Sequence, residues 1–293
     1  MKKSLTFVFS IFVILLLMCT NVYALDNENR TDELKSNNLF TCNSLLYIDY
    51  NQSDILEPIM PLDEIRLIRL NVSYSITGIF SNFYSKLLRS KKEEIELTIA
   101  ESPDWCEVTI TPHTIYPEFT VGGITSEVIL YISLSADAPA FEMDTITIKG
   151  IAKEKRSFLN IFKLIDSTEV EVDIPFVPDY LPNYSVELPE GSSFETPPQN
   201  LTTIPFEITN HGNAITSFHV EVDDVPTDVD YIVSPEDFLL DVDESMKTYL
   251  IVVPNSDFNQ TESINFTITG KHYIYTEKTG ESIISNITIF YDS

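Results

Sequence analysis

The chain has 293 residues, of which 43% are hydrophobic and 22% are charged. Its 45 acidic residues outnumber 18 basic ones and give a net charge of −27 at pH 7. A surface of this sign repels phosphate groups, so the composition argues against nucleic acid as a partner.

The first segment of the chain has the pattern of a secretory signal. Two lysines precede an apolar run over residues 5–19, and a short site of small or apolar residues ends at Ala24. The run is shorter than the roughly 20 residues that a helix needs to cross a bilayer, although an uncleaved anchor stays open as an alternative. We therefore predict a signal peptide over residues 1–24, a flexible segment over 25–40, and a protein that is secreted or held on the extracellular face of the cell envelope.

Short stretches of alternating apolar and polar residues fill the chain after residue 40, and Pro, Gly, Asn and Asp separate them. This spacing is typical of β-sandwiches. The proline-rich stretch PFVPDYLPNY divides the stretches into two sets and suits a short linker. We predict an all-β fold with two tandem sandwich domains, residues 41–179 and 180–293.

Two cysteines remain after the signal peptide, Cys42 and Cys106. In an oxidising exterior, two cysteines most simply form one disulfide. Such a bridge would close a long loop and add roughly 4 kcal/mol on the chain-entropy estimate. We predict this disulfide, with two buried free thiols as the alternative.

One loop of the first domain carries a helical pattern. Apolar residues fall at i, i+1, i+4, i+5, i+8 and i+9 over residues 79–88, which predicts a short amphipathic helix inserted in the sandwich. A second apolar and cationic segment spans residues 153–165. The whole loop over residues 78–94 and this second segment hold eight of the 18 basic residues: Lys86, Arg89, Lys91, Lys92, Lys153, Lys155, Arg156 and Lys163.

Two roles are open for these segments. They can pack on each other and cap an end of the sandwich, because amphipathic helices usually bury one face. They can instead form a docking surface for an anionic membrane or for an acidic, apolar partner. The candidate interaction residues are Ile79, Phe80, Phe83, Tyr84, Lys86, Leu87, Leu88, Arg89, Phe158 and Phe162.

Eight asparagines begin an N-x-S/T sequon and are candidate glycosylation sites: Asn29, Asn51, Asn71, Asn183, Asn200, Asn259, Asn265 and Asn286. Strand side chains alternate between the two faces of a sheet. Asn71, Asn265 and Asn286 lie between apolar positions that point inward, so these three should point outward. Asn265 and Asn286 fall on the last two long strands and should share one sheet face.

The chain also repeats itself. Sliding it by 123 residues places IELTIAESPDWCEVTITP over FHVEVDDVPTDVDYIVSP without a gap, so that Pro112 meets Pro235. Gly150 meets Gly270 at the similar offset of 120. Because apolar positions coincide in phase, we interpret the two domains as copies of one unit.

The second copy contains the turn NHGN, Asn210 to Asn213, followed by Phe218, Pro226 and a closing LIVVP. These features resemble the tandem Ig-like modules of archaeal and bacterial cell-surface proteins, of the kind also appended to some glycoside hydrolases. The resemblance covers most of residues 184–291. It implies Ig-like sandwiches with a scaffolding or binding role and supplies no catalytic residues. The N-x-G-N turn of such modules joins two strands.

Catalytic patterns are absent from the sequence. The four histidines, His113, His211, His219 and His272, show no metal-ligand spacing, and no nucleophile elbow or phosphate-binding glycine loop occurs. The acidic groups EVDDVPTDVD and DVDES could gather oxygens for calcium, but neither follows the helix-loop-helix calcium pattern. We predict that the protein is not an enzyme and has no catalytic residues, no metal site and no cofactor.

We expect a non-enzymatic secreted or cell-surface module with a structural or interaction role. Its expected partner is a cell-envelope protein or glycan, with weak membrane-surface contact and no nucleic acid. An accessory carbohydrate-binding module is the first alternative, and an unrecognised hydrolase is the second.

Overall fold

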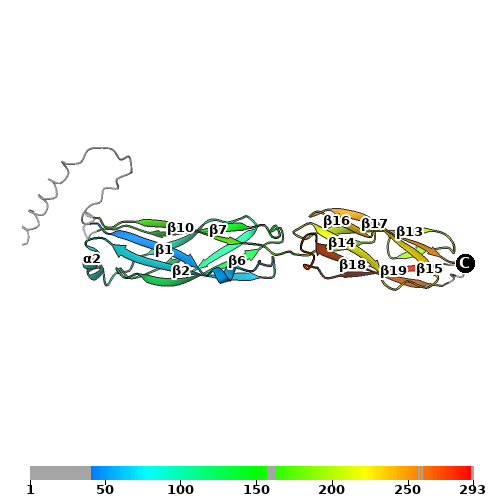
Figure 1. Cartoon of the computed structure of the whole chain (residues 1–293), viewed down its shortest axis with the longest axis horizontal. Coiled ribbons are helices and arrows are strands. Elements are labelled where there is room, and N and C mark those ends of the chain that lie inside the picture. The colour runs from blue at the N-terminus through cyan, green and yellow to red at the C-terminus, as the bar shows by residue number, and fades with distance from the viewer. Residues whose placement is uncertain (1–40, 157–162, 257, 259, 292–293) are drawn as a thin grey trace, which may run out of the picture. The chain divides into compact units, whose positions relative to one another are not determined.

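The computed structural model describes residues 41–156, 163–256, 258 and 260–291. These residues form four sheets, one two-stranded ribbon and the helix α2 (Ser81–Leu87). Figure 1 shows the sheets as two sandwiches that follow each other along the chain. The predicted signal peptide and flexible segment, and the candidates Asn29, Phe158, Phe162 and Asn259, lie outside the described residues. None of the described helices is long and apolar enough to span a membrane.

The first sandwich has two facing sheets of four strands. One sheet has the order β1 (Asn43–Tyr50), β2 (Ile65–Thr77), β6 (Ile124–Leu134), β4 (Cys106–Thr111). The other has the order β10 (Thr168–Phe176), β7 (Asp144–Ala152), β3 (Ile95–Glu101), β5 (Thr114–Ile115). The seven long strands, lettered along the chain, give A-B-E-D facing G-F-C, which is the Ig constant-type order. The 3-10 helix η1 (Gln52–Ile55) and the ribbon β8 (Lys155–Arg156) and β9 (Lys163–Ile165) lie in connections.

The second sandwich repeats this strand order. One sheet has the order β11 (Tyr184–Glu187), β13 (Thr202–Asn210), β17 (Ser245–Pro254), β15 (Val229–Ser234). The other has the order β12 (Ser193–Glu195), β19 (Ile283–Phe290), β18 (Glu262–His272), β14 (Thr216–Val222), β16 (Asp237–Leu240). Only β12 pairs in parallel, with β19. The expectation of Ig-like sandwiches is therefore confirmed at the level of strand order.

The alternation of the sequence explains why these strands form and which face they bury. Along β2, Leu70, Val72 and Tyr74 are at most 1% exposed, whereas Asn71 between them is exposed. Burial of a large apolar side chain stabilises the folded state by roughly 1.5–3 kcal/mol, so each such strand strongly prefers the register that turns its apolar face to the core. Each sandwich has a separate hydrophobic core built in this way.

The structure supports the internal duplication. At the predicted offset of 123, β4 falls directly on β15, and the two strands occupy the same edge position in their sheets. Gly150 in β7 and Gly270 in β18 lie on corresponding strands, although their cross-strand partners, Leu97 and Phe218, are not counterparts at the offset of 123. A Cβ at Gly150 would lie 2.9 Å from the Ile48 side chain, and one at Gly270 would lie 3.0 Å from the Tyr184 ring. In both sandwiches a glycine therefore lets the first strand approach the strand before the last.

The predicted disulfide is wrong, because Cys42 and Cys106 lie at opposite ends of one sheet and are free. Cys42 directly precedes β1, which begins beside Thr77 at the end of β2. Cys106 begins β4 beside the end of β6, where Ser133 pairs with Ile65 at the start of β2. The 13 residues of β2 span about 40 Å at about 3.3 Å per residue. A disulfide tolerates a Cα separation of only about 7 Å.

The predicted linker, residues 177–183, is a packed segment held from both sides. Ile59 of the first sandwich exchanges two backbone hydrogen bonds of 2.7 and 2.8 Å with it. Tyr180 is 2% exposed, and its hydroxyl lies 2.9 Å from Thr216 Oγ1 of the second sandwich. Prolines stiffen this segment, and tertiary hydrogen bonds fix it further.

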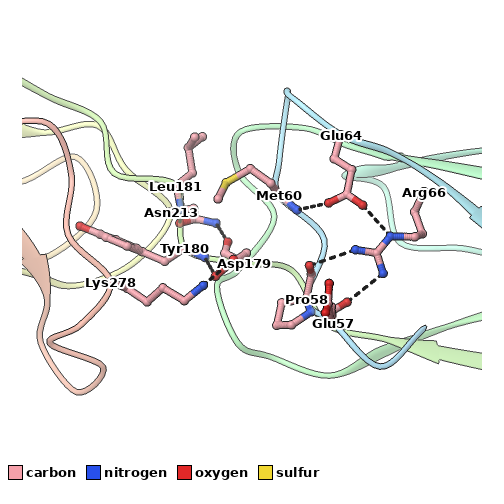
Figure 2. A network of polar contacts seen from close by, with 10 residues as sticks. All are labelled: Glu57, Pro58, Met60, Glu64, Arg66, Asp179, Tyr180, Leu181, Asn213 and Lys278. Carbon is pink, nitrogen blue, oxygen red and sulfur yellow. Dashed lines mark hydrogen bonds and ion pairs between the residues drawn. The ribbon is translucent and has the colours of Figure 1, made fainter. Parts of the chain in front are cut away.

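Asn213, the last residue of the NHGN turn, fastens the linker to both sandwiches. Its Nδ2 donates to Ala138 O at 2.7 Å and to Asp179 O at 2.9 Å, and its Oδ1 accepts from Leu181 N at 2.7 Å. Figure 2 shows Asn213 between Leu181 and Asp179 of this linker. Lys278 Nζ lies 2.7 Å from Asp179 Oδ2. The sequence predicted a turn between strands, and the turn also holds the linker to both sandwiches. We refer to the three hydrogen bonds of the Asn213 side chain as the clasp.

The loop before β2 is ordered by Arg66. Its Nε donates to Glu64 Oε1 at 2.6 Å, and its two terminal nitrogens donate to Glu57 O at 3.1 Å and Pro58 O at 3.2 Å. The same hydrogen bond to Arg66 lowers the pKa of Glu64. This network, on the right of Figure 2, positions the loop that carries Ile59 to the linker.

Candidate functional site

The predicted helix is present in the loop between β2 and β3. It is shorter than residues 79–88 and ends one residue earlier. Gly78 directly follows β2 and has a φ of 128°, a conformation that residues with a side chain rarely adopt. Tyr84 N donates to Phe80 O at 2.9 Å in the first turn of the helix. Figure 1 shows α2 at the end of the first sandwich where β2 ends.

The apolar stripe of this helix divides into two rows. The inner row is half-buried or buried against the first core: Phe80, Tyr84 at 8% exposure and Leu88 at 7%. The outer row is exposed: Ile79 at 79%, Phe83 at 59% and Leu87 at 58%. Neighbouring residues on a helix differ by about 100°, so a short helix lying on a sandwich end buries only one of two adjacent rows.

The basic residues also divide into two groups. Lys86, Arg89, Lys91 and Lys92 are exposed and form no ion pair with any described residue. Those of the second segment do form ion pairs: Lys153 with Glu94 and Glu96, Lys155 with Glu93, Arg156 with Glu154, and Lys163 with Asp166. Positive charge without an ion pair among the described residues therefore follows the outer row along the chain, and the exposed Glu118 is the backbone bridge partner of Lys92. We define the α2 surface as Ile79, Phe83, Leu87, Lys86, Arg89, Lys91 and Lys92.

The two rows of the helix bear on different expected roles. The inner row packs against the first core, which agrees with the capping part of the first alternative. The outer row lies free of the core, as the second alternative requires. The expected contact with Phe158 and Phe162 falls outside the described residues.

A buried carboxylate lies near the same end of the sandwich. Glu93 is 0% exposed, and neither of its carboxylate oxygens has a hydrogen-bond partner among the described residues. Burial raises its pKa from the usual 4.5 to about 7, although Lys155 Nζ at 3.5 Å opposes that change. Glu93 was not among the predicted site residues. The available signal was its phase, because it precedes the inward-facing Ile95 and Leu97 by two and four positions.

Carboxylates gather at two other places without forming a catalytic arrangement. A hollow of about 340 Å³ on the outer face of β3, β7 and β10 is lined by Glu101, Glu171 and Asp173. Thr147 Oγ1 donates to Asp173 at 2.7 Å, and Lys149 Nζ lies 3.3 Å from Glu171. Such cross-strand pairs are ordinary on a solvated sheet face, so the hollow does not favour the hydrolase alternative.

The second gathering involves a histidine. His219 Nδ1 lies 2.8 Å from Asp237 Oδ1, and Glu236 also offers an oxygen within 4.8 Å. The pairing of β14 with β16 makes His219 and Asp237 direct neighbours, which their spacing in the sequence did not reveal. Both acidic residues are exposed, and such groups are common at protein surfaces.

The sequons that the structure describes lie at the surface. Asn51, Asn71, Asn183, Asn200 and Asn286 are exposed, and Asn265 is half-exposed. Asn265 and Asn286 share the outer face of β18 and β19, as predicted. They are directly paired across the two strands, and Asn286 Nδ2 donates to Asn265 Oδ1 at 2.7 Å.

No protein-family profile matches the chain, and no curated protein matches it. Among solved structures, the D00-D0 domain of intimin is 9% identical over 84% of this chain and 100% of that chain, with a TM-score of 0.32. The ASH/PapD-like domain of human CEP192 is 12% identical over 38% of this chain and 85% of that chain, with a TM-score of 0.30. The titin domains z1z2, solved in complex with telethonin, are 8% identical over 81% of this chain and 95% of theirs, with a TM-score of 0.25.

These TM-scores are too low to support any inference, so the fold assignment rests on the strand order described above. Of the resemblance seen in the sequence, the Ig-like strand order is observed.

Proposed function

We propose that this protein is a non-enzymatic structural or interaction module, secreted or held on the extracellular face of the cell envelope, and that it docks through the α2 surface. The observation that carries this proposal is the exposure of Ile79, Phe83 and Leu87 beside cations that have no ion pair among the described residues. Exposed apolar groups rimmed by charge are typical of interaction sites.

The clasp at the linker supports the structural part of the proposal. Independent domains are commonly joined by exposed linkers across which few contacts run. Here Asn213 bonds to the first sandwich through Ala138 and to the linker through Asp179 and Leu181. Such a junction suits a module that transmits load or orientation from a docked end to the rest of the chain.

The test compares the binding of two variants to an envelope fraction of the producing cells. Phe83→Asp places a charge in the outer row, whereas Met143→Asp makes the same change in charge at a 74% exposed position directly before β7. We expect Phe83→Asp to lose association and Met143→Asp to keep it, with both proteins folded by circular dichroism. Wild-type association by Phe83→Asp would exclude docking through the α2 surface.

A further inference from the structure

The α2 surface combines an apolar row with adjacent cations. Phe83 and Leu87 are spaced by four residues within α2, so they lie on one side of the helix, and the exposed Ile79 precedes the helix by two residues. Lys86 follows Phe83 by three positions and therefore lies beside the row, and Arg89 begins the cationic stretch directly after the helix. A helix face with exposed Phe and Leu next to Lys and Arg has the composition of segments that lie in a membrane interface.

The acidic groups closest in sequence do not neutralise this charge. Glu93 is buried and faces Lys155, and Glu94 lies 3.6 Å from Lys153. The chain as a whole carries a net charge of −27. An anionic surface therefore repels most of the protein and attracts the α2 surface, which favours a single orientation of approach.

The N-terminal part of the chain enters the first sandwich at this same end. A Cβ at Gly78, just before α2, would lie 3.4 Å from Cys42 Cα. Residues 20–41 separate Cys42 from the apolar run over residues 5–19. Fully extended, a segment of that length reaches at most about 80 Å. An apolar run that is retained as an uncleaved anchor is therefore joined to the chain at the α2 end of the first sandwich, whereas cleavage after Ala24 removes it.

We infer that the partner of the α2 surface is an anionic lipid bilayer, which the outer row enters at the headgroup level while Lys86, Arg89, Lys91 and Lys92 contact lipid phosphates. This inference rests on the proposed function and names the partner of the same site. Lipid phosphates supply negative charges that can pair with the four cations, and the acyl boundary accepts the apolar row. An acidic protein partner is the other outcome that the test must separate.

The experiment uses a local probe in the full chain. Trp105 is the only tryptophan, so Phe83→Trp in a Trp105→Phe background gives an emission that reports on the outer row alone. The probe is mixed with vesicles of phosphatidylcholine, with or without about one-third phosphatidylglycerol. The matched control is Met143→Trp in the same background, because Met143 is exposed on the loop before β7, away from α2.

We expect a blue shift of the emission from the Phe83→Trp probe, and its quenching by brominated lipid, with the anionic vesicles only. Reversing two cations, Lys86→Glu with Arg89→Glu, should weaken the response by more than about tenfold. Because this variant leaves residues 5–19 unchanged, the loss would show that the vesicles bind the α2 surface and not the N-terminal apolar run. No response to anionic vesicles, an equal response to neutral ones, or an equal response of the Met143→Trp probe would overturn the inference. If the Phe83→Trp probe stays silent while envelope association still depends on Phe83, the lipid inference fails and the proposed function stands.

Discussion

Replacing the buried Glu93 with glutamine should change how the stability of the first sandwich depends on pH. Burial raises the folded-state pKa of Glu93 to about 7 from the usual 4.5. A raised pKa means that the contribution of this group to stability is complete below pH 4.5 and is lost as the pH rises through 7. The difference between the two pKa values corresponds to at most about 3 kcal/mol.

Glutamine stays neutral at every pH, so Glu93→Gln keeps the shape of the protonated side chain and removes the ionisation. We expect the variant to match the wild type near pH 4.5 and to be more stable at pH 8 by up to about 3 kcal/mol. Lys155 loses its ion pair in the variant, but its side chain is 32% exposed and can be solvated.

Urea unfolding at both pH values measures this difference. Trp105 reports on the first sandwich, because it is the only tryptophan and its ring lies 5.6 Å from that of Phe176. Glu94→Gln is the matched control, since Glu94 is 50% exposed and should change stability by no more than about 0.5 kcal/mol. A difference between Glu93→Gln and wild type that does not change with pH would refute the reasoning.

Three further predictions concern the clasp, the thiols and the glycans. Asn213→Ala removes three hydrogen bonds, two of them buried, should lower the free energy of unfolding by about 2–4 kcal/mol, and should speed protease cleavage in the linker; unchanged cleavage would contradict the clasp. Burial raises the pKa of Cys42 and raises that of Cys106 to about 12, so both should react with a thiol reagent only after unfolding, and a bridged peptide in mass spectra would contradict the strand register. Asn265 and Asn286 are too close for two glycans, so glycopeptide mapping should never find both occupied on one molecule.

Strand phase and the duplication were predictable because they depend on local alternation. Leu70, Val72 and Tyr74 could be assigned to the core from the sequence, and the match of Pro112 with Pro235 located two equivalent strands. These features need no knowledge of how distant segments meet.

Features that depend on tertiary placement were not predictable. The sequence does not show at which end of a sheet a residue lies. The disulfide between Cys42 and Cys106 was wrongly predicted for this reason, because the two cysteines lie at opposite ends of one sheet. The helical pattern identified the stripe over residues 79–88, but only the sandwich end determines which of its two rows is buried. The role of Asn213 likewise depends on where the linker passes the turn.

The most direct test of the α2 surface compares one charge placed in each row of the helix. Phe83→Asp and Leu88→Asp make the same change at 59% and 7% exposure. With urea unfolding followed by Trp105, we predict that Phe83→Asp stays within about 0.5 kcal/mol of the wild type. Leu88→Asp should lose at least about 3 kcal/mol, because it buries an unpaired charge. If Phe83→Asp destabilises the sandwich as much as Leu88→Asp, the outer row is packed, and the α2 surface is not free to dock.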